Sequence, residues 1–283
     1  MKHKIGIHLS YWQEAWSDPL PPTFQKAKQA GFEVGELPLL NPREMDFHAL
    51  CADLDAAGLL ASCGTGLSPD TDITSPNEDI RNQGMTHLKA CLEGAAILGS
   101  PVLGGLTYAP WGFFPEDDRV KRRRQCIESL KEAGDFAGKY DVQLCLEVVN
   151  RFEGYLLNTV EQGVALLEDV GHPALRLHLD TFHMNIEEDD IPRAIKFARN
   201  KLGHFHCVAN NRKAPGRGHL RWDQIRDALM AVGYKGYLVA ETFINPAGEI
   251  GQGMAIWRSL ASDLDENARE TARFLREEVA FDV

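Results

Sequence analysis

Four short apolar segments of this chain each end in a side chain that can bind a metal ion. In sequence order they read VQLCLE, LRLHLD, GHFH and YLVAE, and they end at Glu147, Asp180, His206 and Glu241. Each has the length and composition of a buried β-strand. Strand ends converge only where the strands lie side by side and parallel, as in an α/β barrel. We therefore expect such a barrel, with a hard or borderline divalent cation at its C-terminal mouth.

Short apolar runs alternate with amphipathic helical patterns along the whole chain, which is typical of repeated βα units. A (β/α)8 barrel, or TIM barrel, takes about 250 residues. We therefore expect residues 1–283 to form a single domain of this α/β fold. The eight expected strands are Lys4–Leu9, Val34–Leu37, Leu60–Cys63, Pro101–Leu106, Val142–Val148, Leu175–Asp180, Gly203–Val208 and Tyr237–Thr242.

Helices are expected in the intervals between strands, and two of them have specific expected boundaries. One should begin at the capping box Ser75-Pro76-Asn77-Glu78, with proline at its first helical position. The other should be a long final helix from about Gly253 to Glu278, which could pack under the barrel or help to form an oligomer.

The composition narrows the class of protein. A net charge of −11 argues against a nucleic-acid partner and leaves a neutral small substrate open. No apolar run approaches the length needed to cross a bilayer, and the first residues enter a strand without a signal peptide. The six cysteines contain no CxxC pair. We expect reduced, mostly buried thiols in a cytoplasmic protein without a membrane partner.

Strand parity selects the metal ligands among the histidines and acids. His178 and Asp180 share one face of their strand, and His204 and His206 share one face of the next. The later member of each pair lies nearer the mouth, so Asp180 and His206 are the expected ligands. His178 and His204 then lie one layer deeper, as core groups or as groups that support the ligands. Taken singly, each acid could instead form a buried salt bridge or a helix N-cap.

Glu147 and Glu241 end the fifth and eighth strands, on opposite sides of the expected mouth. Two carboxylates flanking a metal suit proton transfer on both faces of one carbon. A divalent cation that bridges a carbonyl and the neighbouring hydroxyl acidifies the C–H bond between them. One glutamate could remove that proton and the other could return one.

Three longer motifs carry a resemblance to a known family. EVVNRFE at 147–153 is followed by LLNT at 156–159, and HLDTFHMNIEE spans 178–188. GHFH at 203–206 is followed by Asn211-Arg212 and Pro215-Gly216. These stretches are similar to the strand-five, strand-six and strand-seven motifs of the ketose 3-epimerases, and the likeness runs from the first strand to the final helix.

The resemblance implies a xylose-isomerase-like barrel that epimerises free ketoses at C3 through a cis-enediolate. Substrates of this family include D-tagatose, D-fructose, D-psicose and L-ribulose. It also implies Mn²⁺, with Co²⁺ or Mg²⁺ as substitutes, and a homodimer or homotetramer. Carried over by position, the metal ligands are Glu147, Asp180, His206 and Glu241.

The same comparison implies roles around the substrate. Glu147 and Glu241 would be the two acid/base groups, and Glu153, His183 and Arg212 would hydrogen-bond the oxygens around C1 to C3. Members of the family usually carry a glutamate three residues after the strand-seven histidine, where this chain has Ala209.

Other functions remain open on the sequence alone. An aldose–ketose or hydroxypyruvate-type isomerase on the same scaffold would move a proton between C1 and C2. A metal-dependent phosphodiesterase or DNA-repair nuclease of similar fold would need more histidine ligands and a basic groove. A sugar-binding protein without activity would not need two carboxylates beside one metal.

Several further side chains are candidates for the pocket. The loop TYAPWGFF contains Trp111 and could wall a sugar site with aromatic faces, or could form a loop core or an interface. His8 and Glu36 could face the pocket or serve as buried hydrogen-bonding groups. The short glycine-rich stretch Cys63–Gly66 is wrongly placed for a phosphate-binding loop, and we expect no cofactor there. The remaining aromatic candidates of the loop are Tyr108, Phe113 and Phe114.

Overall fold

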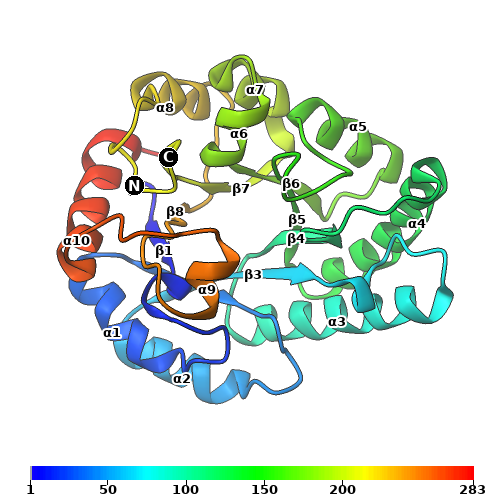
Figure 1. Cartoon of the computed structure of the whole chain (residues 1–283), viewed down its shortest axis with the longest axis horizontal. Helices are drawn as coiled ribbons and strands as arrows, with labels where there is room; N and C mark the ends of the chain where they lie inside the picture. Colours follow the sequence, from blue (N-terminus) through cyan, green and yellow to red (C-terminus); the bar gives the residue numbers. More distant parts are fainter. Residues whose placement is uncertain (1) are drawn as a thin grey trace.

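The computed structural model describes residues 2–283 and confirms the expected (β/α)8 barrel. Eight parallel strands close into a barrel in sequence order, and β1 pairs with β8 to complete it. Figure 1 shows the strands at the centre with the helices arranged around them. The strands are β1 (Ile5–His8), β2 (Val34–Pro38), β3 (Leu60–Leu67), β4 (Val102–Pro110), β5 (Gln143–Val148), β6 (Leu175–Asp180), β7 (Leu202–His206) and β8 (Leu238–Ala240).

Two strands run further toward the mouth than the sequence suggested. The prediction ended β3 at Cys63, yet Gly64 and Gly66 remain in the strand and pair with Gly104 and Leu106 of β4. The ladder hydrogen bonds of the neighbouring strand hold these glycines extended, and periodicity along one segment does not contain that information. The mouth of the barrel is therefore built from backbone with little side-chain bulk on this side.

Helices follow most strands and pack their apolar faces on the barrel. For example, α5 begins at a capping box formed by Thr159 and Gln162 and ends at Gly171, whose φ is 69°. The α-helices are α1 (Pro21–Ala30), α2 (Phe47–Ala57), α3 (Glu78–Ile97), α4 (Arg119–Lys139), α5 (Val160–Val170), α6 (Thr181–Glu187), α7 (Ile191–Ala198), α8 (Trp222–Ala231), α9 (Gly248–Gly253) and α10 (Leu264–Phe274).

The two specific helix predictions were wrong in detail. The N-cap of α3 is Asn77, whose side chain accepts from the Asp79 N–H, so no capping box forms at Ser75. The expected final helix is two helices, α9 and α10, separated by residues 254–263. Ala255 breaks the helix with a φ of 54°, and Asp263 caps the start of α10. A π-helical turn, Leu275–Val279, then ends the helical region.

A buried arginine links loops at the C-terminal end of the barrel. Arg122 of α4 contacts Asp72 at 2.6 Å and donates to the Thr74 hydroxyl at 3.0 Å, both in the segment after β3. The Thr74 hydroxyl in turn lies 2.8 Å from the Tyr155 hydroxyl, in the loop after β5. The loops after β3 and β5 are thus held to α4 in one network, and the loop after β5 also carries Glu153.

Two further expectations concern membrane-spanning segments and the cysteines. Among residues 2–283, no helix is long and apolar enough to cross a membrane. The six cysteines are free thiols, and all but Cys51 are buried, as expected from the sequence.

Candidate metal centre

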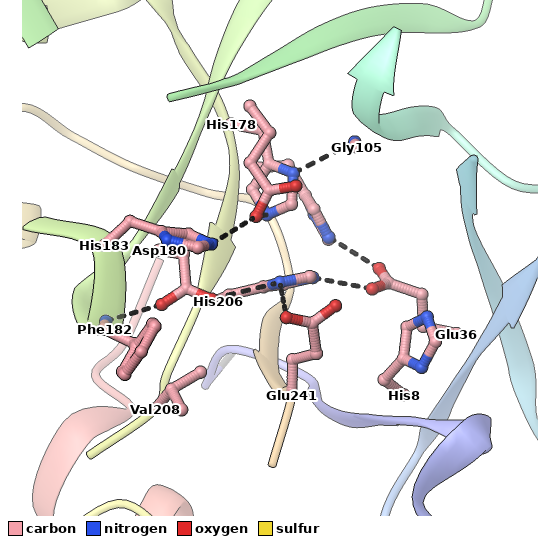
Figure 2. A network of polar contacts seen from close by, with 12 residues as sticks. His8, Glu36, Gly105, His178, Asp180, Phe182, His183, His206, Val208 and Glu241 are labelled. Carbon is pink, nitrogen blue, oxygen red and sulfur yellow. Dashed lines mark hydrogen bonds and ion pairs between the residues drawn. The ribbon is translucent and has the colours of Figure 1, made fainter. Parts of the chain in front are cut away.

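The four side chains expected at the metal converge at the mouth of the barrel. Glu147, Asp180, His206 and Glu241 each offer one ligand atom, and these atoms lie within 4.8 Å of one another. They come from the ends of four consecutive strands, β5 to β8, as the parallel order requires. Figure 2 shows His206 between Glu36 on one side and Asp180 and Glu241 on the other.

Two atoms of this cluster are buried without any hydrogen-bond partner among the described residues. They are Asp180 Oδ2 and His206 Nδ1, which lie 3.7 Å apart. His206 Nδ1 is also 3.6 Å from Glu241 Oε2. Asp180 is fixed through its other oxygen, which accepts the Phe182 N–H at 2.6 Å. Buried polar atoms without partners are costly, so this donor set fits a divalent cation that would satisfy them.

Glu36 of β2 contacts His206 at the ring nitrogen that points away from the four-residue cluster. Its carboxylate lies 2.6 Å from His206 Nε2, 2.6 Å from His204 Nε2 and 2.6 Å from the Ser62 hydroxyl. Burial raises the pKa of Glu36, but the neighbouring His206 and His204 outweigh it and lower that pKa well below its ordinary value. Because Glu36 engages Nε2, the other nitrogen, Nδ1, faces the cluster. A carboxylate behind a histidine ligand is the usual way to orient the ring.

His178 and His204 occupy the deeper layer that strand parity predicted, and both are buried. His178 Nδ1 accepts the Gly105 N–H at 3.2 Å, which leaves its Nε2 at 3.9 Å from Glu147. These two rings and His206 also form a group with metal-ligand spacing. That group contains no carboxylate, so the four-residue cluster is the better candidate for a hard divalent cation.

The pKa values of Glu147 and Glu241 are shifted in opposite directions. Burial, together with the nearby Glu241, raises the pKa of Glu147 well above its ordinary value. Glu241 is partly buried in the cavity wall. Desolvation raises its pKa, but the adjacent His206 outweighs this and lowers the pKa of Glu241 to about 2. Opposed shifts in neighbouring carboxyls are typical of an acid and a base that work as a pair.

The charge of His206 depends on the same neighbours. Burial lowers its pKa, but Glu36 and Glu241 outweigh that and raise the pKa of His206 well above the ordinary value. Without a bound cation the ring is therefore held protonated. A cation at Nδ1 would displace that proton, because the neutral imidazole is the ligand.

Three expected substrate-binding residues lie together beside the cluster and line the same cavity. Arg212 contacts Glu153 at 3.2 Å and Glu241 at 3.4 Å, and its guanidinium lies 3.9 Å from the centre of the Phe182 ring. His183 Nε2 lies 3.8 Å from Glu147. Arg212 and Glu153 are thus a charged pair at the edge of the metal cluster.

Asn150 was not predicted, although it lies within the EVVNRFE motif. Its side-chain amide donates to Glu153 at 2.8 Å and lies 2.8 Å from His183 Nδ1. One asparagine therefore positions two of the three residues. The prediction considered the strand ends themselves, and Asn150 follows β5, which ends at Val148.

The aromatic loop after β4 contributes one residue to the cavity. Trp111 lines it and donates its indole N–H to Glu153 at 3.0 Å. Tyr108 is buried and donates to the backbone oxygen of Glu147 at 2.8 Å. Phe113 packs on Arg122, and Phe114 is largely exposed. Of these aromatic residues Trp111 lines the cavity, while Tyr108 supports the strand that carries Glu147.

Comparison with known proteins shows the family of this chain. Residues 24–278 match the family model described as xylose isomerase-like TIM barrel. The chain is 35% identical to a D-psicose 3-epimerase of Ruminiclostridium cellulolyticum, over 94% of this chain and 92% of that protein. It is 34% identical to an L-ribulose 3-epimerase of Mesorhizobium japonicum, over 96% and 93%. The chain belongs to the ketose 3-epimerase family.

The structural likeness to this family extends over the whole barrel. A crystal structure of a D-psicose 3-epimerase in the presence of D-fructose has a TM-score of 0.94 and 33% identity, covering 98% of this chain and 99% of the other. A structure of L-ribulose 3-epimerase has a TM-score of 0.91 and 32% identity, covering 98% and 94%. The protein is therefore an isomerase of this family, as the sequence motifs implied.

The position where ketose 3-epimerases usually carry a glutamate is Ala209, and it is buried here. Its carbonyl accepts the Arg212 N–H at 3.0 Å, and its N–H donates to the Lys213 carbonyl at 3.0 Å. This tight turn gives Arg212 a φ of 62°. In this epimerase the backbone turn, together with Glu153 and Phe182, sets the place of Arg212 without a carboxylate at 209.

Replacing Glu36 with Gln should weaken metal binding by about 10- to 100-fold, because the ring of His206 loses the acceptor that orients it. A neutral amide can accept from one histidine only, and its NH₂ group would face the other. Titration calorimetry with Mn²⁺ measures the change, with Glu44→Gln on the exposed loop after β2 as the control. Unchanged affinity in Glu36→Gln would mean that Glu36 only fills the barrel.

Proposed function

We propose that this enzyme catalyses the metal-dependent epimerisation of free ketoses at C3, with substrates of the D-psicose, D-fructose, D-tagatose or L-ribulose type. The observation that carries the proposal is the pair of carboxyls Glu147, which is buried, and Glu241, which is partly buried. They come from β5 and β8, share one metal-competent cluster, and have pKa values shifted in opposite directions. The activities named for the relatives support the same reaction.

The metal ligands of the proposal are Glu147, Asp180, His206 and Glu241, and the cation is Mn²⁺, with Co²⁺ or Mg²⁺ as substitutes. Three carboxylate oxygens and one imidazole nitrogen suit these ions. When bound, the cation polarises the substrate carbonyl and the adjacent hydroxyl, which acidifies the C–H bond at C3.

Glu147 and Glu241 transfer the proton to and from C3 of the ketose. Glu241 as a carboxylate takes the proton from C3 on one face, which leaves a cis-enediolate across C2 and C3. Glu147 as a carboxylic acid donates a proton to the opposite face, so the configuration at C3 inverts. In the reverse direction the two residues exchange roles. Arg212, 3.4 Å from Glu241, holds positive charge beside the developing negative charge.

Glu153, His183 and Arg212 are the proposed contacts to the substrate oxygens around C1 to C3. They lie on the side of the cavity formed by the loops after β5, β6 and β7, next to the metal cluster. Trp111 fixes Glu153 and adds an aromatic face at the same edge. Together they would place C3 between the two acid/base carboxyls.

Replacing Arg212 with Ala should raise KM and lower kcat together, by about 10-fold each, because charged hydrogen bonds to the substrate are lost in both ground and transition states. Steady-state kinetics on the preferred ketose measures both constants. Arg217→Ala is the control, since that arginine lies on the same loop with an exposed side chain. Unchanged constants for Arg212→Ala would make Arg212 a structural residue of the rim.

The function itself is tested by an activity screen. Mn²⁺-loaded protein is incubated with free ketopentoses and ketohexoses, and the products are separated by chromatography. The proposal expects the C3 epimer of the supplied ketose. An aldose as the main product would instead support an isomerase that moves a proton between C1 and C2.

We further propose a cytoplasmic homodimer or homotetramer. Free, mostly buried thiols fit a reducing compartment, and the family likeness favours a small symmetric assembly. Light scattering on purified protein gives the molar mass, and a monomer at working concentration would refute the assembly.

A further inference from the structure

We propose that His8 is a specificity-determining residue that recognises the hydroxyl on C4 of the ketose, the carbon next to the reaction centre. This proposal rests on the proposed C3 epimerisation. His8 is buried at the end of β1 and lines the same cavity as Glu147 and Glu241. It belongs neither to the metal cluster nor to the group around Arg212, so the proposed mechanism assigns it no role.

The pairing of the strands places His8 beside the reacting centre. In the β1–β8 ladder Ile7 pairs with Ala240, so His8 and Glu241 follow at neighbouring strand ends. On its other side His8 pairs with Glu36 of β2. Figure 2 shows His8 close to Glu36 on the side of the cluster away from His183. A group at this place meets the substrate just beyond the carbon on which Glu241 acts.

The ring of His8 has one nitrogen engaged and one available. Its Nδ1 lies 2.5 Å from the Ser10 hydroxyl, which fixes the ring, and its Nε2 has no hydrogen-bond partner among the described residues. The ring of Phe243 lies 6.3 Å away and borders the same cavity. The Ser10 hydroxyl can donate or accept, so Nε2 is an acceptor in one tautomer and a donor in the other. A sugar hydroxyl satisfies both cases.

The direction of the substrate follows from the charged residues. Glu153, His183 and Arg212 gather on the β5 to β7 side, where they would hold the C1 end. The carbons beyond C3 then extend toward β1 to β4. The cavity wall there is mostly apolar or glycine, with Pro38, Leu40, Gly64, Gly66, Leu67 and Leu106, and it also includes Thr65 and Trp16.

The glycines on that wall leave room and offer no side-chain contact. A Cβ atom added to Gly64 or Gly66 would meet no other atom within 4 Å. Both have the parity of Ser62, whose hydroxyl points inward to Glu36. The far end of the ketose thus has space and few hydrogen-bond partners. Thr65 donates to the Leu39 carbonyl at 2.8 Å, and Glu36 is engaged by His204 and His206. Among the ends of β1 to β4, recognition of a hydroxyl beyond C3 is therefore assigned to His8.

The test uses D-fructose and D-tagatose, which differ in configuration at C4 alone, together with 4-deoxy-D-fructose. His8→Phe keeps an aromatic ring but removes Nε2, whereas His8→Gln keeps a polar group at nearly the same reach. We expect the ratio of kcat/KM between D-fructose and D-tagatose to move about 10-fold toward unity in His8→Phe and to be partly restored in His8→Gln. Against 4-deoxy-D-fructose, His8→Phe and wild type should be equally active.

Two further variants complete the test. Ser10→Ala removes the hydrogen bond that fixes the ring of His8, and it should shift the ratio of kcat/KM between D-fructose and D-tagatose in the same direction by a smaller factor. His48→Phe, on the exposed face of α2, should leave the ratio unchanged. Mn²⁺ content is measured for every variant, and sugar affinities are measured by calorimetry, so a loss of metal is not mistaken for a change of specificity.

The outcomes separate this inference from the proposed function. An equal loss on all sugars, including 4-deoxy-D-fructose, would overturn the role of His8 at C4. A larger response to 6-deoxy-D-fructose than to 4-deoxy-D-fructose would overturn it as well. If the wild type does not epimerise any ketose at C3, the proposed function itself fails, independently of His8.

Discussion

Replacing Glu241 with Gln should lower kcat for C3 epimerisation by roughly 10²- to 10⁴-fold, because an amide cannot take the proton from C3. Glu147→Gln should have an effect of the same order, since the proton must be returned on the opposite face. Chromatography of the two epimers over time measures the rate. Metal content measured alongside separates loss of the acid/base group from loss of the ion.

Isotope labelling makes the same prediction more specific. Wild-type turnover in D₂O should place deuterium at C3 of the product. One of the two Gln variants can still exchange the C3 proton of unreacted substrate, because the remaining glutamate serves one face. Deuterium found only at C1, or an aldose as the main product, would reject the two-glutamate mechanism at C3. Glu249→Gln, in the first turn of α9, is the matched control.

Removal of the metal should abolish activity, and Mn²⁺ or Co²⁺ should restore it. The reason is the cluster of three carboxylates and one imidazole, in which Asp180 Oδ2 and His206 Nδ1 are buried without partners. His206→Ala should weaken metal binding because the site loses its nitrogen donor. Full activity in a sample from which the ion has been stripped by chelation would exclude the proposed site.

Thermal unfolding gives a second readout of the metal that does not depend on activity. An ion that binds only the folded chain stabilises it by about 2.7 kcal/mol at a concentration 100 times Kd. Mn²⁺ should therefore raise the Tm of the wild type and raise it much less in His206→Ala. His219→Ala, on the exposed loop before α8, should respond to Mn²⁺ like the wild type.

The sequence predicted most of the barrel because the relevant signals are local. Short apolar runs locate the strands, and parity within β6 and β7 places Asp180 and His206 nearer the mouth than His178 and His204. The four expected ligands end consecutive strands, so parallel order alone brings them together. The final helix was predicted wrongly because Ala255 adopts a left-handed conformation that alanine does not favour, and no local pattern marks it.

By itself, then, the sequence determined the strand order, the set of metal-competent ends and the family of the enzyme. The tertiary structure alone decided what touches those ends. Glu36 meets His204 and His206 across the barrel, 168 and 170 residues away along the chain. The free nitrogen of His8 and the open wall at Gly66 likewise arise from closure of β1 against β8 and from the pairing of β3 with β4. The physical reason is that the periodicity of a strand specifies which face of the sheet each side chain points to. The partners of that side chain depend instead on which strands lie next to each other in the closed barrel.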